Sequence, residues 1–478
     1  MVAMFVFAAA VGVLLSASIA SGPVILDARW GTLIRLSLWG LAWIAAVAAA
    51  LRLPTRVALC LTFGTGLALR LAALAGPPVT SDDLFRYAWD ARVQDVGVNP
   101  YRYPPASEEL AGLREPWLWP DEVGCTELDR PPGCTRINRP SAPTIYPPLA
   151  QAWFLAVDEL APDGARHTTW QVAGLITEVG VLALVPVALG RWGGDRRWSA
   201  LYALSPAPVM EIVQNGHVDG VAILAVLGAL VVVAPTSDST RSRALRQVSA
   251  GALIGAAAMV KLYPAVLVLA LVGVGGSRRT AVLVRAGAGA CTVAVMAYLP
   301  QVVSVGWRVL GYLPGYLEEE DYIEGGRFLV ATALGLPPAM AALASASAAL
   351  GIACWVLVQR PAPPVGAAAL LGALLLATSP VQPWYAVALL AAATVAVRPW
   401  WGAVMVAGYP YYFSVILDHP FAVVLGRLTY VTALVVIVAG AWRSRAVRLD
   451  RKQGPGHENL GTVDAQKSLW RPQEKTSR

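Results

Sequence analysis

The chain has 478 residues, of which 56% are hydrophobic and only 14% are charged. Soluble proteins carry about 25% charged residues, so the composition excludes an ordinary soluble enzyme and indicates one membrane domain. The net charge of +7 comes from arginines that flank apolar runs, as membrane topology requires. We therefore expect the lipid bilayer, and no nucleic acid, as a partner.

Apolar segments repeat along the chain and predict an all-α polytopic membrane protein. Residues 1–20 resemble a secretory signal peptide, but they lack a Lys or Arg before the apolar stretch and are predicted to be a retained first helix. About fourteen segments are predicted to be membrane helices, with boundaries uncertain by several residues. These are 3–20, 32–51, 57–75, 168–189, 199–213, 217–234, 246–259, 263–275, 281–299, 338–357, 364–379, 383–397, 400–416 and 420–441.

Arginines fall in every second connection, which predicts the orientation of the helices. Cytoplasmic loops of membrane proteins are enriched in Lys and Arg, so the basic set is expected to be cytoplasmic, together with both termini. The polar tail 443–478 is predicted to be a disordered basic segment on that side. The other connections face outward, and the longest of them is 76–167. The basic set comprises Arg52 and Arg56, Arg191, Arg196 and Arg197, Arg241, Arg243 and Arg246, Arg278 and Arg279, Arg360, Arg398, and the tail from Arg443.

The outward loop begins with a predicted helix over 80–97. Thr80 or Ser81 can cap it, and Asp82 and Asp83 fall in its first turn, where the helix dipole favours negative charge. Phe85, Trp89, Arg92 and Val96 share one face, and Asp83, Arg86 (or Tyr87) and Asp90 share another. This pattern predicts an amphipathic helix that could lie on the outer membrane surface. Dipole stabilisation alone would explain the two carboxylates, but their place beside a membrane span, with aromatics and Arg, favours a functional site.

Further along the same loop, Cys125 and Cys134 stand in a stretch rich in Pro and Gly. If the loop lies outside the cell, a disulfide between them is expected. A zinc site is not expected, because no further Cys and no His lies near the pair.

Three sequence runs resemble the GT-C superfamily of membrane glycosyltransferases. They are SDDLFRYAWDAR, followed by GVNPYRYPP, and then TIYPPLAQ at 144–151. The best match is to the bacterial polyprenyl-phosphate-mannose-dependent α-mannosyltransferases of glycosyltransferase family 87. The likeness is specific over 80–105 and 144–151, and it is weaker around 211–219, 259–264 and 382–385.

The resemblance implies a GT-C-like bundle of about 12–14 transmembrane helices over 1–442, active on the extracytoplasmic face of the plasma membrane. It implies transfer of a hexose, with mannose as first choice, from a polyprenyl-phosphate-mannose donor to a glycolipid or lipoglycan acceptor. An Asp at the start of the outer-loop helix acts as base in that superfamily, so Asp82 is the first choice and Asp83 the second. The stretch 106–143 looks like an insertion that shapes the acceptor side.

Transfer with inversion needs one base for the acceptor hydroxyl and cations or NH donors for the departing phosphate. The phosphate candidates are Lys261, His217, Arg327 and Arg86. Snorkelling of Lys261 and pairing of Arg327 with acids of 318–321 are the simpler alternatives. No cofactor or metal is expected, although the aspartate doublet leaves a divalent cation open.

Other polar groups at outer helix ends are candidates for binding the sugar or the acceptor. In EIVQNGHVDG, Glu211, Asn215 and Asp219 share one face if the helix continues across Gly216, and they could then bind sugar hydroxyls. The alternative is that these residues form a hydrogen-bond network between helices and bind no ligand. Aromatics near 384 can equally be interface anchors. A lone Glu178 within a span must be protonated or paired. The candidates are Glu211, Asn215, Asp219, Tyr87, Asp90, Gln382, Trp384, Tyr385 and His419, with Asp418 beside the last.

Two other functions compete with the glycosyltransferase. A transporter or flippase of a lipid-linked sugar should show two related halves with broken helices in corresponding places, and the sequence shows none. A non-catalytic relative that acts as an assembly partner would not depend on Asp82.

Overall fold

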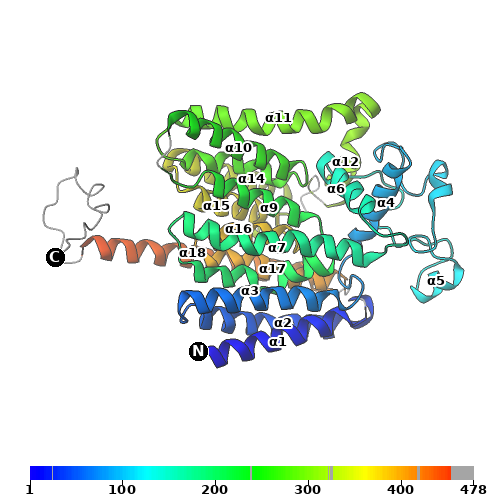
Figure 1. Cartoon of the computed structure of the whole chain (residues 1–478), viewed down its shortest axis with the longest axis horizontal. Coiled ribbons are helices and arrows are strands. Elements are labelled where there is room, and N and C mark those ends of the chain that lie inside the picture. The colour runs from blue at the N-terminus through cyan, green and yellow to red at the C-terminus, as the bar shows by residue number, and fades with distance from the viewer. Residues whose placement is uncertain (24, 237–238, 321, 323–326, 417–419, 454–478) are drawn as a thin grey trace, which may run out of the picture.

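The structure is a computed structural model, and it describes the chain except for residues 24, 237–238, 321, 323–326, 417–419 and 454–478. All regular elements within the described residues are helices, so the predicted all-α polytopic class is confirmed. The helices run side by side along the long axis of the molecule, and a smaller loop-rich region covers one end of them (Figure 1).

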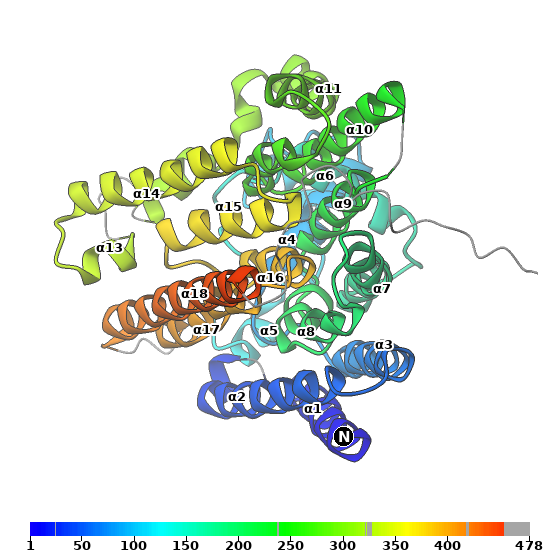
Figure 2. The ribbon, with the colours of Figure 1, turned by 90° about the vertical axis from the view of Figure 1, so that its left-hand side faces the viewer.

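The N-terminal helices pack together along one side of the bundle, as both views show (Figures 1 and 2). They are α1 (Val2–Ala20), α2 (Ile25–Ala50) and α3 (Thr55–Ala72), the last followed by the short η1 (Ala73–Ala75). Pro54 directly precedes α3, where its fixed φ suits the start of a helix. These three apolar helices match the first three predicted segments.

The middle of the chain runs across the bundle. Its order is α7 (His167–Arg191), η3 (Arg196–Trp198), α8 (Ser199–Ala203), the π-helix η4 (Pro208–Gln214), α9 (Asp219–Val232), α10 (Thr240–Ala258), the 3₁₀-helix η5 (Tyr263–Gly273) and α11 (Arg279–Val305). Helices α7 and α8 pack against α3, and α10 and α11 lie on the side opposite the N-terminal helices (Figure 2). Small residues let α10 and α11 approach closely: a Cβ on Gly251 or Gly289 would collide with the facing backbone.

The C-terminal part supplies the remaining helices, α14 (Pro338–Gln359), α15 (Pro363–Ala377), α16 (Tyr385–Val395), η7 (Pro399–Trp401), α17 (Gly402–Ile416) and α18 (Ala422–Gln453). Helix α16 lies at the centre, where every residue from Ala386 to Val395 is buried (Figure 2). Helix α18 continues to Gln453, beyond Arg443 where a polar tail was expected; residues 454–478 lie outside the described part.

Seven described helices are long and apolar enough to cross a membrane, or up to eight if the bent pair η4 and α9 counts as one span. Fewer of the described helices pass this test of length and composition than the 12–14 transmembrane helices expected. Each predicted segment has a helix, but several are short: α16 has 11 residues and α15 has 15. Eleven residues reach only about 17 Å, against a hydrocarbon core of about 30 Å. Because α16 is wrapped by other helices, its apolar character reflects burial in protein.

The chain bends sharply between η4 and α9, by 120°. Gly216 sits in this bend at φ +69°, and a Cβ there would press on the Leu84 side chain. The helix therefore does not continue across Gly216, so the condition under which Glu211, Asn215 and Asp219 would share one face is not met. The bend instead carries them to the end of the bundle that the outer loop covers.

The loop-rich region contains α4 (Asp83–Asp95), η2 (Glu108–Leu113), α5 (Glu122–Glu127) and α6 (Pro148–Glu159) from the long connection. The elements η6 (Gly306–Leu310), α12 (Leu313–Glu319) and α13 (Leu329–Ala333) come from the connection between α11 and α14. Figure 1 shows α4, α5, α6 and α12 at the same end of the bundle, away from the N-terminus.

The predicted membrane-surface helix is a buried helix in the structure. Helix α4 starts at Asp83, with Asp82 as its N-cap residue, and ends before Gly97, which has φ +76°. Its aromatic face does not meet lipid, because residues of the predicted insertion cover it. Trp117 packs on Phe85 and Trp119 on Trp89, each with ring centroids 5.8 Å apart.

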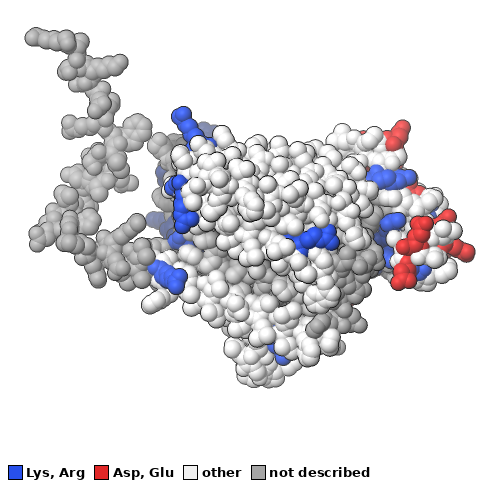
Figure 3. All heavy atoms as spheres, turned by 90° about the horizontal axis from the view of Figure 1, so that it is seen from below, with Lys and Arg blue, Asp and Glu red and all other residues white. Residues whose placement is uncertain are grey.

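Charge is distributed unevenly between the two ends of the molecule (Figure 3). On the face shown, Asp and Glu appear only at the loop-rich end, and many Lys and Arg side chains gather at the end where the N-terminus lies. Between these ends, the face shown carries no Asp or Glu and only a few Lys or Arg side chains, as expected for a surface in contact with lipid.

A buried ion pair joins α3 to α7 and supplies the partner that the sequence did not reveal for Glu178. Arg70 Nη2 lies 2.6 Å from Glu178 Oε2, and both side chains are fully buried. Tyr202 donates to Glu178 Oε1 at 2.7 Å, and Arg70 Nη1 donates to the carbonyls of Gly66 and Ala203. The pair is therefore fully hydrogen-bonded inside the bundle.

We expect Arg70→Ala to destabilise the protein by about 3–5 kcal/mol, because Glu178 would be left buried without a counter-charge. Thermal unfolding in detergent micelles measures the effect. Arg56→Ala, on the exposed start of the same helix, is the control and should change stability by less than about 0.5 kcal/mol. Equal melting temperatures for the two variants would contradict this account of the pair.

Candidate active site

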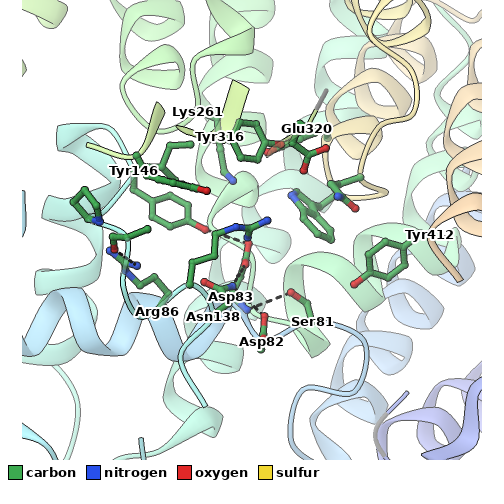
Figure 4. Close-up of a pocket in the computed structure, with 18 residues that line it drawn as sticks. Ser81, Asp82, Asp83, Arg86, Asn138, Tyr146, Lys261, Tyr316, Glu320 and Tyr412 are labelled. Atoms are coloured by element: carbon green, nitrogen blue, oxygen red, sulfur yellow. Dashed lines mark hydrogen bonds between the residues drawn. The ribbon is translucent and has the colours of Figure 1, made fainter. Parts of the chain in front are cut away.

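A polar cavity of about 220 Å³ lies where the loop-rich region meets the helix bundle (Figure 4). Six parts of the chain form its walls: the start of α4, the stretch before α6, the turn after α10, the segment around α12, the turn before α16, and the last part of α17. Its lining residues are Ser81, Asp82, Asp83, Arg86, Asn138, Arg139, Ala142, Pro143, Ile145, Tyr146, Lys261, Tyr312, Tyr316, Glu320, Gln382, Trp384, Tyr385 and Tyr412.

The two carboxylates at the start of α4 share one amide donor. Asn138 Nδ2 donates to Asp82 Oδ1 at 3.0 Å and to Asp83 Oδ1 at 2.7 Å. The second oxygen of Asp83 accepts a hydrogen bond from Tyr146 Oη at 3.1 Å. Figure 4 shows both carboxylates beside Asn138, at the wall of the cavity opposite Lys261.

The surroundings push the pKa values of the two carboxyl groups apart. Burial, and then the charge of Asp83, raise the pKa of Asp82 above its ordinary value of 3.8. Burial also acts to raise the pKa of Asp83, but the hydrogen bond and charge of His217 and the charge of Lys261 outweigh it, and the pKa is lowered. Asp83 is thus the ionised anchor of the pair, and Asp82 is the stronger base.

His217 lies beneath Asp83 and is fully buried. Its Nδ1 is 3.5 Å from Asp83 Oδ2 and 3.5 Å from Tyr87 Oη, and its Nε2 is 3.6 Å from Glu211 Oε2. The imidazole stacks on Trp384, with ring centroids 4.3 Å apart. Because His217 does not line the cavity, it can act on the site through Asp83.

The polar residues of the bend hold the segment that leads to Asp82. Asn215 accepts from the Thr80 backbone N–H at 3.2 Å and donates to the Thr80 hydroxyl at 2.7 Å. Tyr412 donates to the Thr80 carbonyl at 2.5 Å. Glu211 receives hydrogen bonds from Asn215 and Tyr409. Two of the predicted sugar ligands, Glu211 and Asn215, therefore fix the backbone behind the cavity.

Lys261 follows α10 and stands between the polar cavity and a second, apolar one. Its Nζ is 3.5 Å from Asp219 Oδ2, which is fully buried, and lies over the rings of Tyr146 and Tyr385 at 5.0 and 5.2 Å. The second cavity measures about 470 Å³ and shares Lys261, Ile145, Tyr146, Tyr316 and Tyr385 with the first. Its other walls include Leu262, Val266, Leu313, Leu374, Leu375 and Val381.

The two arginines proposed for phosphate differ in their bonding. Arg327 lines the apolar cavity, and its guanidinium is bound to Glu320 and to the carbonyls of Thr378 and Pro380. Arg86 lines the polar cavity and is bonded to Asp90 and to the Ala142 carbonyl. Its Nη2 is buried without a hydrogen-bond partner, so it has a donor to spare.

The remaining predicted residues divide between the cavity wall and the protein behind it. Gln382, Trp384 and Tyr385 line the polar cavity, and Trp384 Nε1 is buried without a partner. Tyr87 and Asp90 do not line it: Tyr87 stacks on Phe154 at 4.4 Å, and Asp90 accepts from Thr144 and Gln151. Asp418 and His419 lie outside the described residues.

Several cavity residues were not predicted. Tyr146 lies within the motif TIYPPLAQ, so its motif was noticed although its role was not. Asn138 and Arg139 come from the apparent insertion, where no pattern singled them out. Tyr316 and Tyr412 come from distant segments, and only the fold brings them to the site. Glu320 was named only as one of the acids that could pair with Arg327, and the structure shows this pair.

The two loop cysteines form a disulfide, and the described residues contain no evident metal site. Cys125 and Cys134 are joined by the predicted disulfide. Among the residues that the structure describes, no group of three or more His, Cys, Asp or Glu side chains is arranged to hold a metal ion.

Comparison with known proteins gives one match. The family model described as glycosyltransferase family 87 matches residues 144–380, about half of the chain. The matched part includes His217, Lys261 and Arg327, whereas the carboxylate pair and Asn138 precede it. No curated protein and no solved structure matches the chain.

The lowered pKa of Asp83 predicts a pH-dependent contribution to stability. A carboxyl group with a depressed folded pKa stabilises the fold above its unfolded pKa, and this contribution is lost as pH falls. The stability advantage of the wild type over Asp83→Asn should therefore be constant near neutral pH and shrink below about pH 3.8. Unfolding in detergent at a series of pH values tests this, and a constant difference down to pH 3 or below would contradict it.

Proposed function

Because the chain belongs to glycosyltransferase family 87, we propose that it transfers a hexose, with mannose as first choice, from a polyprenyl-phosphate donor. The acceptor is a hydroxyl of a glycolipid or lipoglycan, and the configuration at the sugar carbon inverts. The observation that carries the proposal is the junction at Lys261, where a polar cavity with two carboxylates meets an apolar cavity.

The two cavities suit the two halves of a lipid-linked sugar. The apolar cavity takes the first part of the prenyl chain, and the polar cavity takes the sugar. Lys261 stands at their boundary, where the phosphate that joins the two halves would lie. Arg86 Nη2 and Trp384 Nε1 are spare donors along the polar wall. Arg327 is a weaker phosphate candidate, because protein acceptors already occupy its guanidinium.

The proposed chemistry needs one base. Asp82 removes the proton of the acceptor hydroxyl, whose oxygen attacks the anomeric carbon of the donor sugar. The bond from that carbon to the phosphate oxygen breaks, and the polyprenyl phosphate leaves with the electron pair beside Lys261. Asp83 stays ionised and keeps His217 and Tyr146 in place. No second carboxylate and no covalent intermediate are required.

The charge distribution supports an orientation in the plasma membrane. The basic end of the molecule would face the cytoplasm, with both termini, by the positive-inside rule. The loop-rich end with the cavity would then be extracytoplasmic, where nucleotide sugars are absent and a lipid carrier must supply the sugar. The disulfide between Cys125 and Cys134 agrees with an oxidising compartment.

We expect Asp82→Asn to lower transfer by about 10²–10⁴-fold, because the variant keeps the shape of the side chain and loses the base. The measurement uses membranes with radiolabelled polyprenyl-phosphate-mannose and a lipid extract, followed by analysis of the labelled lipids. Asp95→Asn, at the exposed end of the same helix, is the matched control and should be fully active. A transporter or an assembly partner would keep its function in Asp82→Asn.

We expect Lys261→Ala to raise the KM for the lipid-linked donor by about tenfold or more, because the phosphate would lose a charged donor. The KM for the acceptor should change little. Lys261→Arg keeps the charge and the pairing with Asp219, so it separates phosphate binding from the cost of leaving Asp219 unpaired. If the donor KM is the same in Lys261→Ala and the wild type, the phosphate does not lie at Lys261.

A further inference from the structure

The loop that precedes the matched family region ends in the cavity. This loop runs from residue 118 to 139, and the Cys125–Cys134 disulfide closes a turn within it. Asn138 and Arg139, at its end, line the polar cavity. Since the family model begins at residue 144, it assigns no role to either of them.

Asn138 makes the only side-chain hydrogen bond to Asp82 among the described residues. A primary amide has two N–H groups on one nitrogen, so Nδ2 can donate one to each carboxylate of the pair. Asn138 Nδ2 lies 3.0 Å from Asp82 Oδ1 and 2.7 Å from Asp83 Oδ1, and both distances fall in the ordinary range for N–H···O hydrogen bonds. The amide therefore links two like charges that would otherwise repel each other.

The backbone before Asn138 is fixed by the loop itself. Thr135 Oγ1 donates to the Leu118 carbonyl at 2.7 Å and accepts from the Ile137 N–H at 3.1 Å. The Arg136 N–H donates to the same Leu118 carbonyl at 2.9 Å, and Arg130 donates to the Thr135 carbonyl. The disulfide holds Cys134, the neighbour of Thr135, against α5.

The residue after Asn138 is held from the other side of the cavity. Arg139 adopts φ +44°, a left-handed conformation that side chains other than Gly rarely adopt. Its guanidinium binds Glu319 at the end of α12 through two nitrogens, at 2.8 and 2.5 Å. Tyr312 donates to the same carboxylate at 2.7 Å. Strained conformations persist only where their surroundings over-determine them, and here they aim Asn138 at the carboxylates.

We propose that Asn138 is a positioning residue for the catalytic carboxylates, and that the disulfide-closed loop exists to hold its amide between Asp82 and Asp83. The inference rests on the proposed function, because it assigns Asn138 an effect on transfer through Asp82. Asn138 orients the carboxylate of Asp82 and opposes the rise of its pKa that burial causes.

The pH dependence of the pair involves groups from every surrounding element. The amide of Asn138 lowers the pKa of both carboxyl groups, against the effect of burial. The other charged or titratable groups that act on the pair are Arg130, Arg139, His217, Lys261, Tyr87, Tyr146, Tyr385 and Tyr412. All of these remain when Asn138 is replaced, so its own effect can be isolated.

The test is the pH profile of kcat/KM for Asn138→Ala in the full-length protein. We expect transfer at neutral pH to fall by about 10- to 100-fold, the worth of one hydrogen bond to a charged group. We also expect the acid limb of the profile to move to higher pH, because the pKa of Asp82 rises when the amide is lost. The position of this limb does not depend on how much protein is folded, so a merely structural role would not move it.

Asn99→Ala is the matched control. Asn99 belongs to the same long connection, and its amide likewise donates to two side-chain oxygens, those of Gln301 and Ser304, outside the cavity. The acid limb of the pH profile of kcat/KM for Asn99→Ala should coincide with that of the wild type. If Asn138→Ala also shows the wild-type rate and limb, the inference is overturned. If instead Asp82→Asn remains active, the proposed function itself has failed.

The role of the disulfide is tested by the double variant Cys125→Ser with Cys134→Ser. If the loop holds Asn138 in place, this variant should shift the acid limb in the same direction as Asn138→Ala, by a smaller amount. Adding Asn138→Ala to the double variant should then shift the limb no further than Asn138→Ala alone. A double variant with the wild-type rate and limb would overturn the role assigned to the disulfide.

Discussion

Two neighbouring carboxylates at the start of α4 can be kept close together only while other groups offset their mutual repulsion and their loss of water. Asn138 links them, Tyr146 and His217 act on Asp83, and Lys261 faces them across the cavity. Asn138 and Tyr146 come from the stretch before α6, and His217 and Lys261 come from two other segments of the chain. The arrangement of the loop-rich end can therefore be understood as the means of bringing four donors to one pair of acids.

The bend between η4 and α9 is the part of the bundle that makes this arrangement possible. It turns backbone and polar side chains toward the loop-rich end of the bundle. Asn215 then fixes Thr80, His217 reaches Asp83, and Asp219 pairs with Lys261. Irregular backbone at membrane depth is tolerated where protein surrounds it, and every residue of this bend is buried.

The sequence predicted the all-α membrane class correctly, but it did not predict which helices are buried in protein and which are exposed at the surface of the bundle. Hydropathy located every helix of the bundle, because apolar runs are a local signal. It could not separate α16, buried in protein, from α1, which is largely exposed along the bundle, because both environments select the same residues. The aromatic face of α4 was assigned to lipid for the same reason, although Trp117 and Trp119 of the loop cover it.

Site residues were predictable where their own chemistry is unusual for their surroundings. A Lys or an aspartate pair beside apolar runs stands out. Asp82, Asp83 and Lys261, which line the cavity, were singled out by this context and, for the aspartates, by the family resemblance as well. Asn138 carries no such signal, since an Asn in a polar loop is ordinary. Its importance comes from a backbone held on one side by a disulfide and on the other by Arg139 and Glu319, which are 180 residues apart in the sequence. Such a position depends on the whole fold, and no local pattern in the chain encodes it.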